Sequence, residues 1–317
     1  MWRKVVNGAG FLLFAAAIVF VGLRLADNIG DIGKAATSAA TWGVVAGGAV
    51  VYAVLTLPLA AAWTILLARA GAPGATFIGT VEVFGRSQIA KYIPGNVFHL
   101  VGRQLLGVGK GWPQGAVAVS SVVEALAQGS AATATVLFIG FWAHGGPFEM
   151  VSPVLAVVGG IAALSAPSLI VRVTPLLPIA RRAQFLQDAA GLGRGTAIAR
   201  ALIIYLAFFM AASGLLWMIV LGAAPNVPVT HFPTIAAAFV SAWLIGNVTP
   251  SAPGGLGVRE ALMLAQIGPV IGESEAVVAV ITFRLVTILG DLSFFALAQG
   301  VRYRQRSGRY VSDETGA

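Results

Sequence analysis

Long apolar segments without charges dominate the chain, and their lengths predict helices that cross a membrane. A helix rises about 1.5 Å per residue, so about 20 apolar residues span a hydrocarbon core of about 30 Å. Six segments satisfy this length: Val5–Leu23, Trp42–Leu67, Gly115–Ala143, Val151–Ile170, Ala201–Leu221 and Ala276–Val301. The first also has the length of a signal peptide. No small-residue cleavage site follows it and the rest of the chain is equally apolar, so we predict a span.

Two further segments, Thr76–Gly111 and Thr234–Gly268, are apolar but interrupted. Pro94-Gly95 divides the first, and a Pro/Gly-rich stretch at positions 249–257 divides the second. Each half is too short to cross the hydrocarbon core as a helix. We therefore predict two re-entrant hairpins; a full span followed by a half-helix is the alternative for either segment.

The composition excludes a water-soluble globule and a disordered chain. Hydrophobic residues make up 58% of the chain, charged residues only 10%, and the mean hydropathy is +0.88. Soluble domains carry about 25% charged residues. The absence of cysteine excludes disulfides, thiol nucleophiles and cysteine-bound metals. The three histidines lack metal-ligand spacing, so we expect neither a metal nor another cofactor.

The basic residues predict the orientation of the chain in the membrane. If both termini are cytoplasmic and each hairpin returns to its own side, 13 basic residues fall in cytoplasmic segments and only Arg24 and Lys34 fall outside. This asymmetry follows the positive-inside rule. The net charge of +8 therefore reflects membrane orientation, and we expect no nucleic-acid partner.

In this topology the two hairpins enter the membrane from opposite sides, which is typical of transporters with inverted repeats. The predicted fold class is an all-α polytopic membrane protein. It has about six full transmembrane helices and two oppositely oriented, Pro/Gly-broken hairpins, with an inverted repeat as the implied symmetry. We predict one membrane domain over residues 1–301 and a short basic cytoplasmic tail over residues 302–317.

Charged residues at membrane depth are the candidates for function. Each costs about 2.5–3.5 kcal/mol at the centre of a lone helix, so they must face one another, a polar cavity or the interface. Glu82 and Arg86 have i,i+4 spacing, while Arg284 and Asp291 have i,i+7 spacing, so both pairs share a helical face. Internal ion pairs that only fix packing are the alternative explanation. The candidates for lining or gating a groove are Glu82, Arg86, His99, Glu124, Arg284 and Asp291. For His99, a hydrogen-bonded structural role is favoured over a functional one.

The two breaks predict an anion site. A helix can begin near Asn96 after the first break and near Gly257 after the second, and helix N-termini bind phosphate or carboxylate. Arginines follow on both short helices and can hold phosphate oxygens. A kink without a ligand is the alternative. The candidate substrate-binding residues are Lys91, Pro94, Gly95, Asn96, Arg103, Pro253, Gly254, Gly255, Gly257, Arg259 and Glu260.

Both breaks resemble signatures of a known family. Ala90-Lys91-Tyr92-Ile93-Pro94-Gly95-Asn96-Val97 with Gly102-Arg103, and Pro253-Gly254-Gly255-Leu256-Gly257-Val258-Arg259-Glu260, are similar to the two motifs of the lysylphosphatidylglycerol synthase transmembrane-region family. The family is also described as flippase-like. In the multiple peptide resistance factors this region is associated with moving aminoacylated phosphatidylglycerol between leaflets, and an aminoacyl-transfer domain follows it. Other stand-alone members are associated with isoprenoid lipids or glycolipids.

The resemblance implies a lipid translocator in a bacterial or archaeal inner or plasma membrane. Its cargo would be a phospholipid, an isoprenoid lipid or a glycolipid whose phosphate lies between the hairpins. Because the chain ends soon after its last span, we expect no synthase domain and no enzymatic activity. The alternatives are a small-anion transporter, a non-transporting partner of a lipid-biosynthetic enzyme, or an intramembrane lipid-phosphate enzyme. A homo-oligomer is a further candidate partner. No nucleotide-binding loop is present, so ion coupling through Glu82, Glu124 or Asp291 is the alternative to downhill transport.

Overall fold

The computed structural model describes residues 2–93, 98–143, 153–173, 192, 195–249 and 252–314. In these ranges every regular element is a helix, which confirms the all-α prediction. The α-helices are α1 (Trp2–Asp27), α2 (Ile29–Thr37), α3 (Ala39–Arg69), α4 (Phe77–Gln88), α5 (Phe98–Val108), α6 (Gln114–Gly140), α7 (Pro153–Val173), α9 (Ala197–Ala223), α10 (Phe232–Val248), α11 (Val258–Ile271) and α12 (Glu273–Glu314). Within the described ranges three 3₁₀ turns accompany them: η1 (Ile89–Tyr92), η4 (Val229–His231) and η5 (Pro253–Gly255).

Five helical segments of the described chain are long and apolar enough to cross a membrane. Helices α3, α6 and α9, and the Glu273–Arg304 part of α12, confirm four of the predicted spans. Helices α1 and α7, with 26 and 21 residues, cover the described parts of the other two predicted segments. The fifth, Val229–Val248, joins η4 to α10. This length matches a full span followed by the half-helix α11, so re-entry of the second hairpin stays a prediction.

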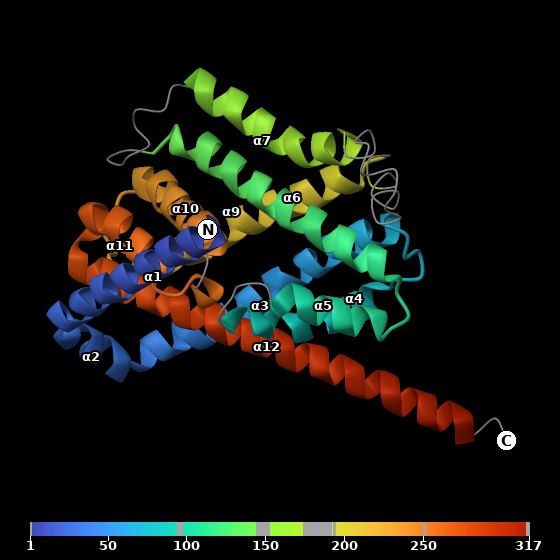
Figure 1. The fold of residues 1–317 in the computed structure, drawn as a ribbon. Coiled ribbons are helices and arrows are strands. Elements are labelled where there is room, and N and C mark those ends of the chain that lie inside the picture. The colour runs from blue at the N-terminus through green and yellow to red at the C-terminus, as the bar shows by residue number, and fades with distance from the viewer. Residues whose placement is uncertain are drawn as a thin grey trace.

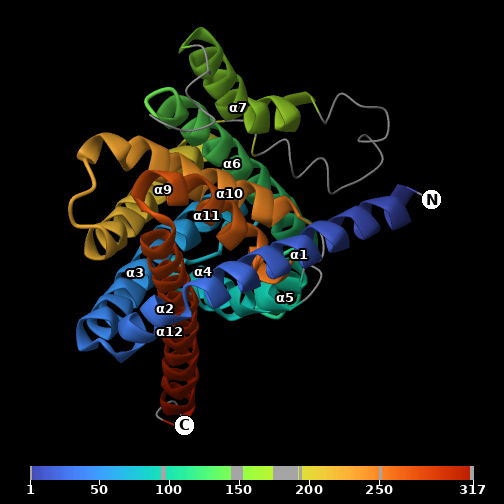
Figure 2. The same cartoon turned by 90° about the vertical axis from the view of Figure 1, so that its left-hand side faces the viewer.

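The helices form a bundle around α3, α6, α9 and α12 (Figure 1). Helix α12 runs along α3 and α4, α7 packs on α6, and α1 lies across α11. Both views show the C-terminal part of α12 extending beyond the other helices (Figures 1 and 2). The first break thus lies between α4 and α5, and the second lies between α10 and α11.

The second break forms where the backbone adopts conformations that favour glycine. Gly254, Gly255 and Gly257 have φ values of 57°, 74° and 76°, in the left-handed region. Residues with a Cβ are strained there, so these glycines allow the chain to turn from η5 into α11. Gly257 is the residue that precedes α11, which confirms the predicted start of that helix.

Aromatic and small side chains pack α4 into the bundle. Trp63 of α3 contacts the rings of Phe84 and Trp112 at centroid distances of 6.4 and 5.9 Å, and Phe84 contacts Phe294 of α12 at 6.1 Å. Gly85 lies directly against α12: a Cβ built there would be 2.6 Å from the Cβ of Ala298. The closeness of α4 and α12 therefore requires a glycine.

We expect Gly85→Ala to destabilise the protein by about 1–3 kcal/mol, because the added methyl group overpacks a backbone-fixed contact. Gly214→Ala in α9 is the matched control, since no atom lies within 4 Å of its added Cβ. The control should be neutral or stabilising, as alanine is favoured over glycine in a helix. Thermal unfolding in detergent measures both; equal melting temperatures would contradict the close α4–α12 contact.

Candidate functional site

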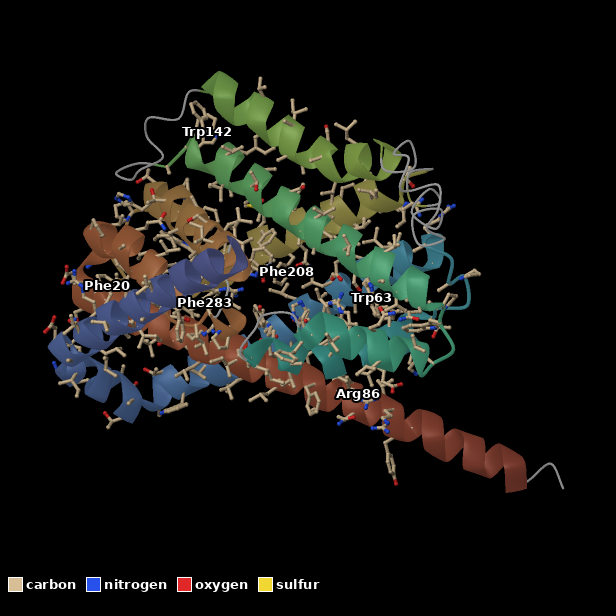
Figure 3. The ribbon with its side chains drawn as sticks, in the orientation of Figure 1. Phe20, Trp63, Arg86, Trp142, Phe208 and Phe283 are labelled. Atoms are coloured by element: carbon tan, nitrogen blue, oxygen red, sulfur yellow. The ribbon has the colours of Figure 1, made fainter. Side chains whose placement is uncertain are left out.

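A polar cavity of about 90 Å³ lies within the bundle and is lined from both breaks; we call it the central cavity. One water needs about 10–15 Å³, so the cavity holds several waters or one small polar group. Figure 3 labels Phe208, which lines the cavity, and Trp63, whose ring contacts the lining residue Arg103. The structure brings six predicted residues together here: Lys91, His99, Arg103, Glu124, Gly254 and Arg259. Lining residues that the sequence did not single out include Tyr52, Gln88, Tyr205, Trp243 and Asn247.

Arg103 of α5 is held in an ion pair with Glu124 of α6. Both side chains are buried, with 4% and 3% of their surface exposed. The Arg103 guanidinium also lies over the rings of Phe84 and Trp63, at 4.2 and 4.8 Å from the centroids. Gln128 Nε2 donates to the other carboxylate oxygen of Glu124 at 3.0 Å. The charge of Arg103 is therefore already balanced within the protein.

Lys91 is balanced by a residue of α12. Its Nζ lies 2.7 Å from Asp291 Oδ2, and Tyr92 OH donates to the same oxygen at 2.6 Å. The Asp291 side chain is buried, and its second oxygen, Oδ1, has no hydrogen-bond partner among the described residues. The ion pair and the hydrogen bond fasten the first break to the middle of α12.

Arg284 connects α12 to the second break. Its Nε lies 2.9 Å from Glu260 Oε1, and its Nη2 donates to the Gly254 carbonyl at 3.4 Å. The Arg284–Asp291 pairing that the spacing suggested is not formed. Seven residues separate the two side chains by about 10 Å along the helix, and each finds an opposite charge on a neighbouring element at shorter range.

Arg259 of α11 differs from these cations because it forms no ion pair with any of the described residues. In the described part of the chain no carboxylate lies within ion-pair distance of it, and its buried Nε has no hydrogen-bond partner. Its guanidinium lies 5.7 Å from the ring centroid of Trp243. A Cβ at Gly246 or at Gly255 would collide with its side chain. Two glycines therefore give Arg259 the room to lie at the cavity.

The two breaks touch each other although about 160 residues separate them in the sequence. A Cβ at Gly254 would lie 3.1 Å from Tyr92 Cδ1, so the tyrosine ring rests on the glycine. The start of α11 is covered differently: a Cβ at Gly257 would lie 2.8 Å from Ile18 Cδ1 of α1. Helix α1, not the central cavity, therefore meets this predicted anion-binding helix start.

Several predicted residues are not placed in the wall of the cavity. Pro94, Gly95 and Asn96 lie outside the described residues, so the helix start predicted there stays a prediction. Pro253 and Gly255 form η5 beside Gly254, and Glu260 contacts Arg284. Glu82 and Arg86 form the ion pair that their spacing suggested, at 3.2 Å, but on the other side of α4 in a separate cleft.

The aromatic and amide residues of the wall gave little signal in the sequence. Tyr205 and Trp243 lie inside long apolar helices, where the sequence alone does not distinguish a cavity wall from ordinary packing. Asn247 carried a weak signal, as a polar residue immediately before a Pro/Gly break. The charged residues and the Pro/Gly breaks of the site could therefore be recognised from the sequence, whereas its aromatic residues could not.

One family model matches the chain. It is described as the lysylphosphatidylglycerol synthase TM region and matches residues 8–292 of the 317. The matched range includes both breaks and the two α12 residues that contact them. No curated protein matches the chain.

Proposed function

The chain belongs to the lysylphosphatidylglycerol synthase transmembrane-region family, which gives it a lipid-related role in a membrane, and we propose that it translocates a phosphate-bearing lipid between leaflets. The headgroup phosphate would occupy the central cavity while the acyl or isoprenoid tails stay in the bilayer. On this proposal the protein performs no chemistry on the lipid.

The observation that carries the proposal is the buried Arg259, which forms no ion pair with a carboxylate in the described part of the chain. A buried charge without a partner is costly, and an anion supplied from outside removes that cost. The guanidinium presents parallel N–H donors that match two oxygens of a phosphate group. Arg259 is therefore suited to accept a headgroup phosphate.

The charge balance around the cavity fits a phosphodiester. Four cations lie at the cavity or in contact with the second break, against three carboxylates, which leaves a net charge of +1. A phosphodiester carries one negative charge, so its binding would neutralise the site. The cations are Lys91, Arg103, Arg259 and Arg284, and the carboxylates are Glu124, Glu260 and Asp291.

Entry of a headgroup requires the cavity to widen, because about 90 Å³ admits only a small group. Helix α12 is tied to the first break through Asp291 and to the second through Arg284. A phosphate at Arg259 would compete with Asp291 for Lys91 and so loosen one of these ties. Replacement of Asp291 by the phosphate as the partner of Lys91 would therefore release α12 from the first break and allow the cavity to widen.

Leaflet-to-leaflet movement of fluorescent phosphatidylglycerol in reconstituted vesicles tests the proposal. We expect faster loss of outer-leaflet fluorescence than in empty vesicles, and we expect it for further phosphate-bearing headgroups as well. No acceleration with any of several anionic and zwitterionic lipids would overturn lipid translocation.

The small size of the cavity favours a second candidate, transport of a small soluble anion. The same vesicles distinguish it, because uptake of radiolabelled phosphate without movement of lipid would assign the site to a soluble substrate. If a lipid is the substrate, we expect fluorescent lipid to move between leaflets without uptake of radiolabelled phosphate.

We expect Gly246→Ala to weaken lipid translocation by about tenfold while leaving the fold intact. The new methyl group displaces the Arg259 side chain, and misplacing one charged contact costs about 1.5–3 kcal/mol. Gly214→Ala again serves as the control, because its added methyl group meets no neighbour. If both variants move lipid at the wild-type rate, the position of Arg259 does not matter for transport.

A further inference from the structure

A second opening lies on the other side of α4 and is much larger, with a volume of about 680 Å³. Its charged residues come from three parts of the chain: Glu82 and Arg86 from α4, Lys110 from the turn after α5, and Arg302 from α12. We call it the basic cleft. None of the described residues lines both this cleft and the central cavity. Figure 3 shows Arg86 between α4 and the outer part of α12.

The cleft contains more positive charge than its single carboxylate can balance. Glu82 is buried, with 6% of its side chain exposed, and both of its oxygens are engaged: Oε1 lies 3.2 Å from Arg86 Nη1 and Oε2 lies 2.6 Å from Lys110 Nζ. Arg302 is half-buried and forms no ion pair with any described residue. Three cations and one carboxylate leave a net charge of +2, which suits an anionic ligand with several oxygens.

The surroundings of the cleft point to a lipid as the source of that anion. Leu105 lines the cleft and is 71% exposed, although it lies beside the cations. Phe77 and Ile78 lie in the chain between the lining residues Thr76 and Gly79, and they are 45% and 56% exposed. Exposed apolar side chains next to converging cations match an amphipathic ligand, with its phosphate among the charges and its tails against the apolar residues.

The location agrees with this assignment. The cleft lies near the C-terminal ends of α3 and α5 and the start of α6, where α12 leaves the bundle (Figure 1). This is the end of the bundle that the positive-inside rule places in the cytoplasm. Basic pockets between transmembrane helices on that side are suited to anionic headgroups.

We propose that the basic cleft is a second phosphate site, which binds the headgroup of an anionic lipid at the cytoplasmic surface. It is independent of the proposed function, because its residues and its opening are separate from those of the central cavity. Arg302, which has no carboxylate partner among the described residues, contributes the donors that the bound phosphate requires.

Native mass spectrometry of lipid retention tests the proposal, with equal amounts of phosphatidylglycerol and phosphatidylcholine offered to the protein. All variants also carry Arg259→Gln, so that the central cavity does not contribute and failure of the proposed function leaves the result unaffected. Arg302→Gln is compared with Arg304→Gln, which removes the same charge from an exposed position on the same helix.

We expect Arg302→Gln to reduce retained phosphatidylglycerol about fivefold relative to Arg304→Gln, with phosphatidylcholine unchanged. Arg302→Lys should restore part of the loss, because it keeps the charge without the paired donors. Equal phosphatidylglycerol on the two glutamine variants would overturn the site. Retention of glycerol 3-phosphate in place of phosphatidylglycerol, when both are offered equally, would assign the cleft to soluble phosphates and overturn the lipid assignment.

Discussion

Arg259→Gln is expected to slow lipid translocation at least about thirtyfold, because truncating a buried charge that pairs with a ligand costs about 2–5 kcal/mol. Gln keeps the length of the side chain and some of its hydrogen bonding but removes the charge. The fold should survive, since the described structure gives Arg259 no carboxylate that would be left unpaired. Rates from vesicles with matched protein content measure the effect.

Two further variants distinguish an effect of the Arg259 charge on transport from an effect on folding. Arg259→Lys should retain intermediate activity, because it preserves the charge and loses the bidentate geometry. Arg304→Gln removes an exposed charge from α12 and should behave as the wild type. Wild-type rates for Arg259→Gln would show that Arg259 does not hold the cargo, whereas loss of folded protein would make the residue structural.

The largest expected effect on stability comes from Glu124→Gln, at about 3–5 kcal/mol of lost folding free energy. This substitution leaves Arg103 as a buried charge without its carboxylate, and removing one partner of a buried pair costs about this much. The measurement is thermal unfolding in detergent, together with the yield of monodisperse protein. Lys34→Gln, at an exposed ion pair with Asp31, is the control and should change stability by less than about 1 kcal/mol.

A double variant, Arg103→Met with Glu124→Leu, tests whether the unpaired charge of Arg103 causes this loss of stability. Replacing a buried ion pair by apolar residues is often neutral or stabilising, and methionine preserves the contacts with the rings of Phe84 and Trp63. The double variant should therefore recover most of the stability that Glu124→Gln loses. A double variant as unstable as the single one would mean that packing, not the unpaired charge, determines the loss.

The positions of the spans could be predicted from the sequence because the bilayer imposes a minimum apolar length on them. Helix α2 was not predicted: nine residues with Asp31 and Lys34 among them have neither that length nor that composition. Its place depends on tertiary contacts, such as the hydrogen bond from Ser274 to Asp31. The extension of α12 to Glu314 was also missed, because its last turns are polar and lie beyond the apolar segment.

In the candidate site, too, the charged residues and the glycines could be predicted from the sequence but their tertiary contacts could not. Charged residues in an apolar chain mark functional candidates at once, and the glycines of the second break marked its position. Their partners were not predictable, because Tyr92 and Asp291 are 199 positions apart and only the folded bundle brings them together. Spacing along one helix correctly indicated Glu82–Arg86 but suggested Arg284–Asp291, where neighbouring elements supply nearer charges.

The measurement that tests the central claim most directly is mass spectrometry of the lipids that the purified protein retains, comparing wild type with Arg259→Gln. We expect a specific phosphate-bearing lipid to be enriched on the wild type and lost from the variant, while folding is unchanged. The same bulk-like lipids on both proteins would contradict the claim that Arg259 holds a headgroup phosphate in the central cavity.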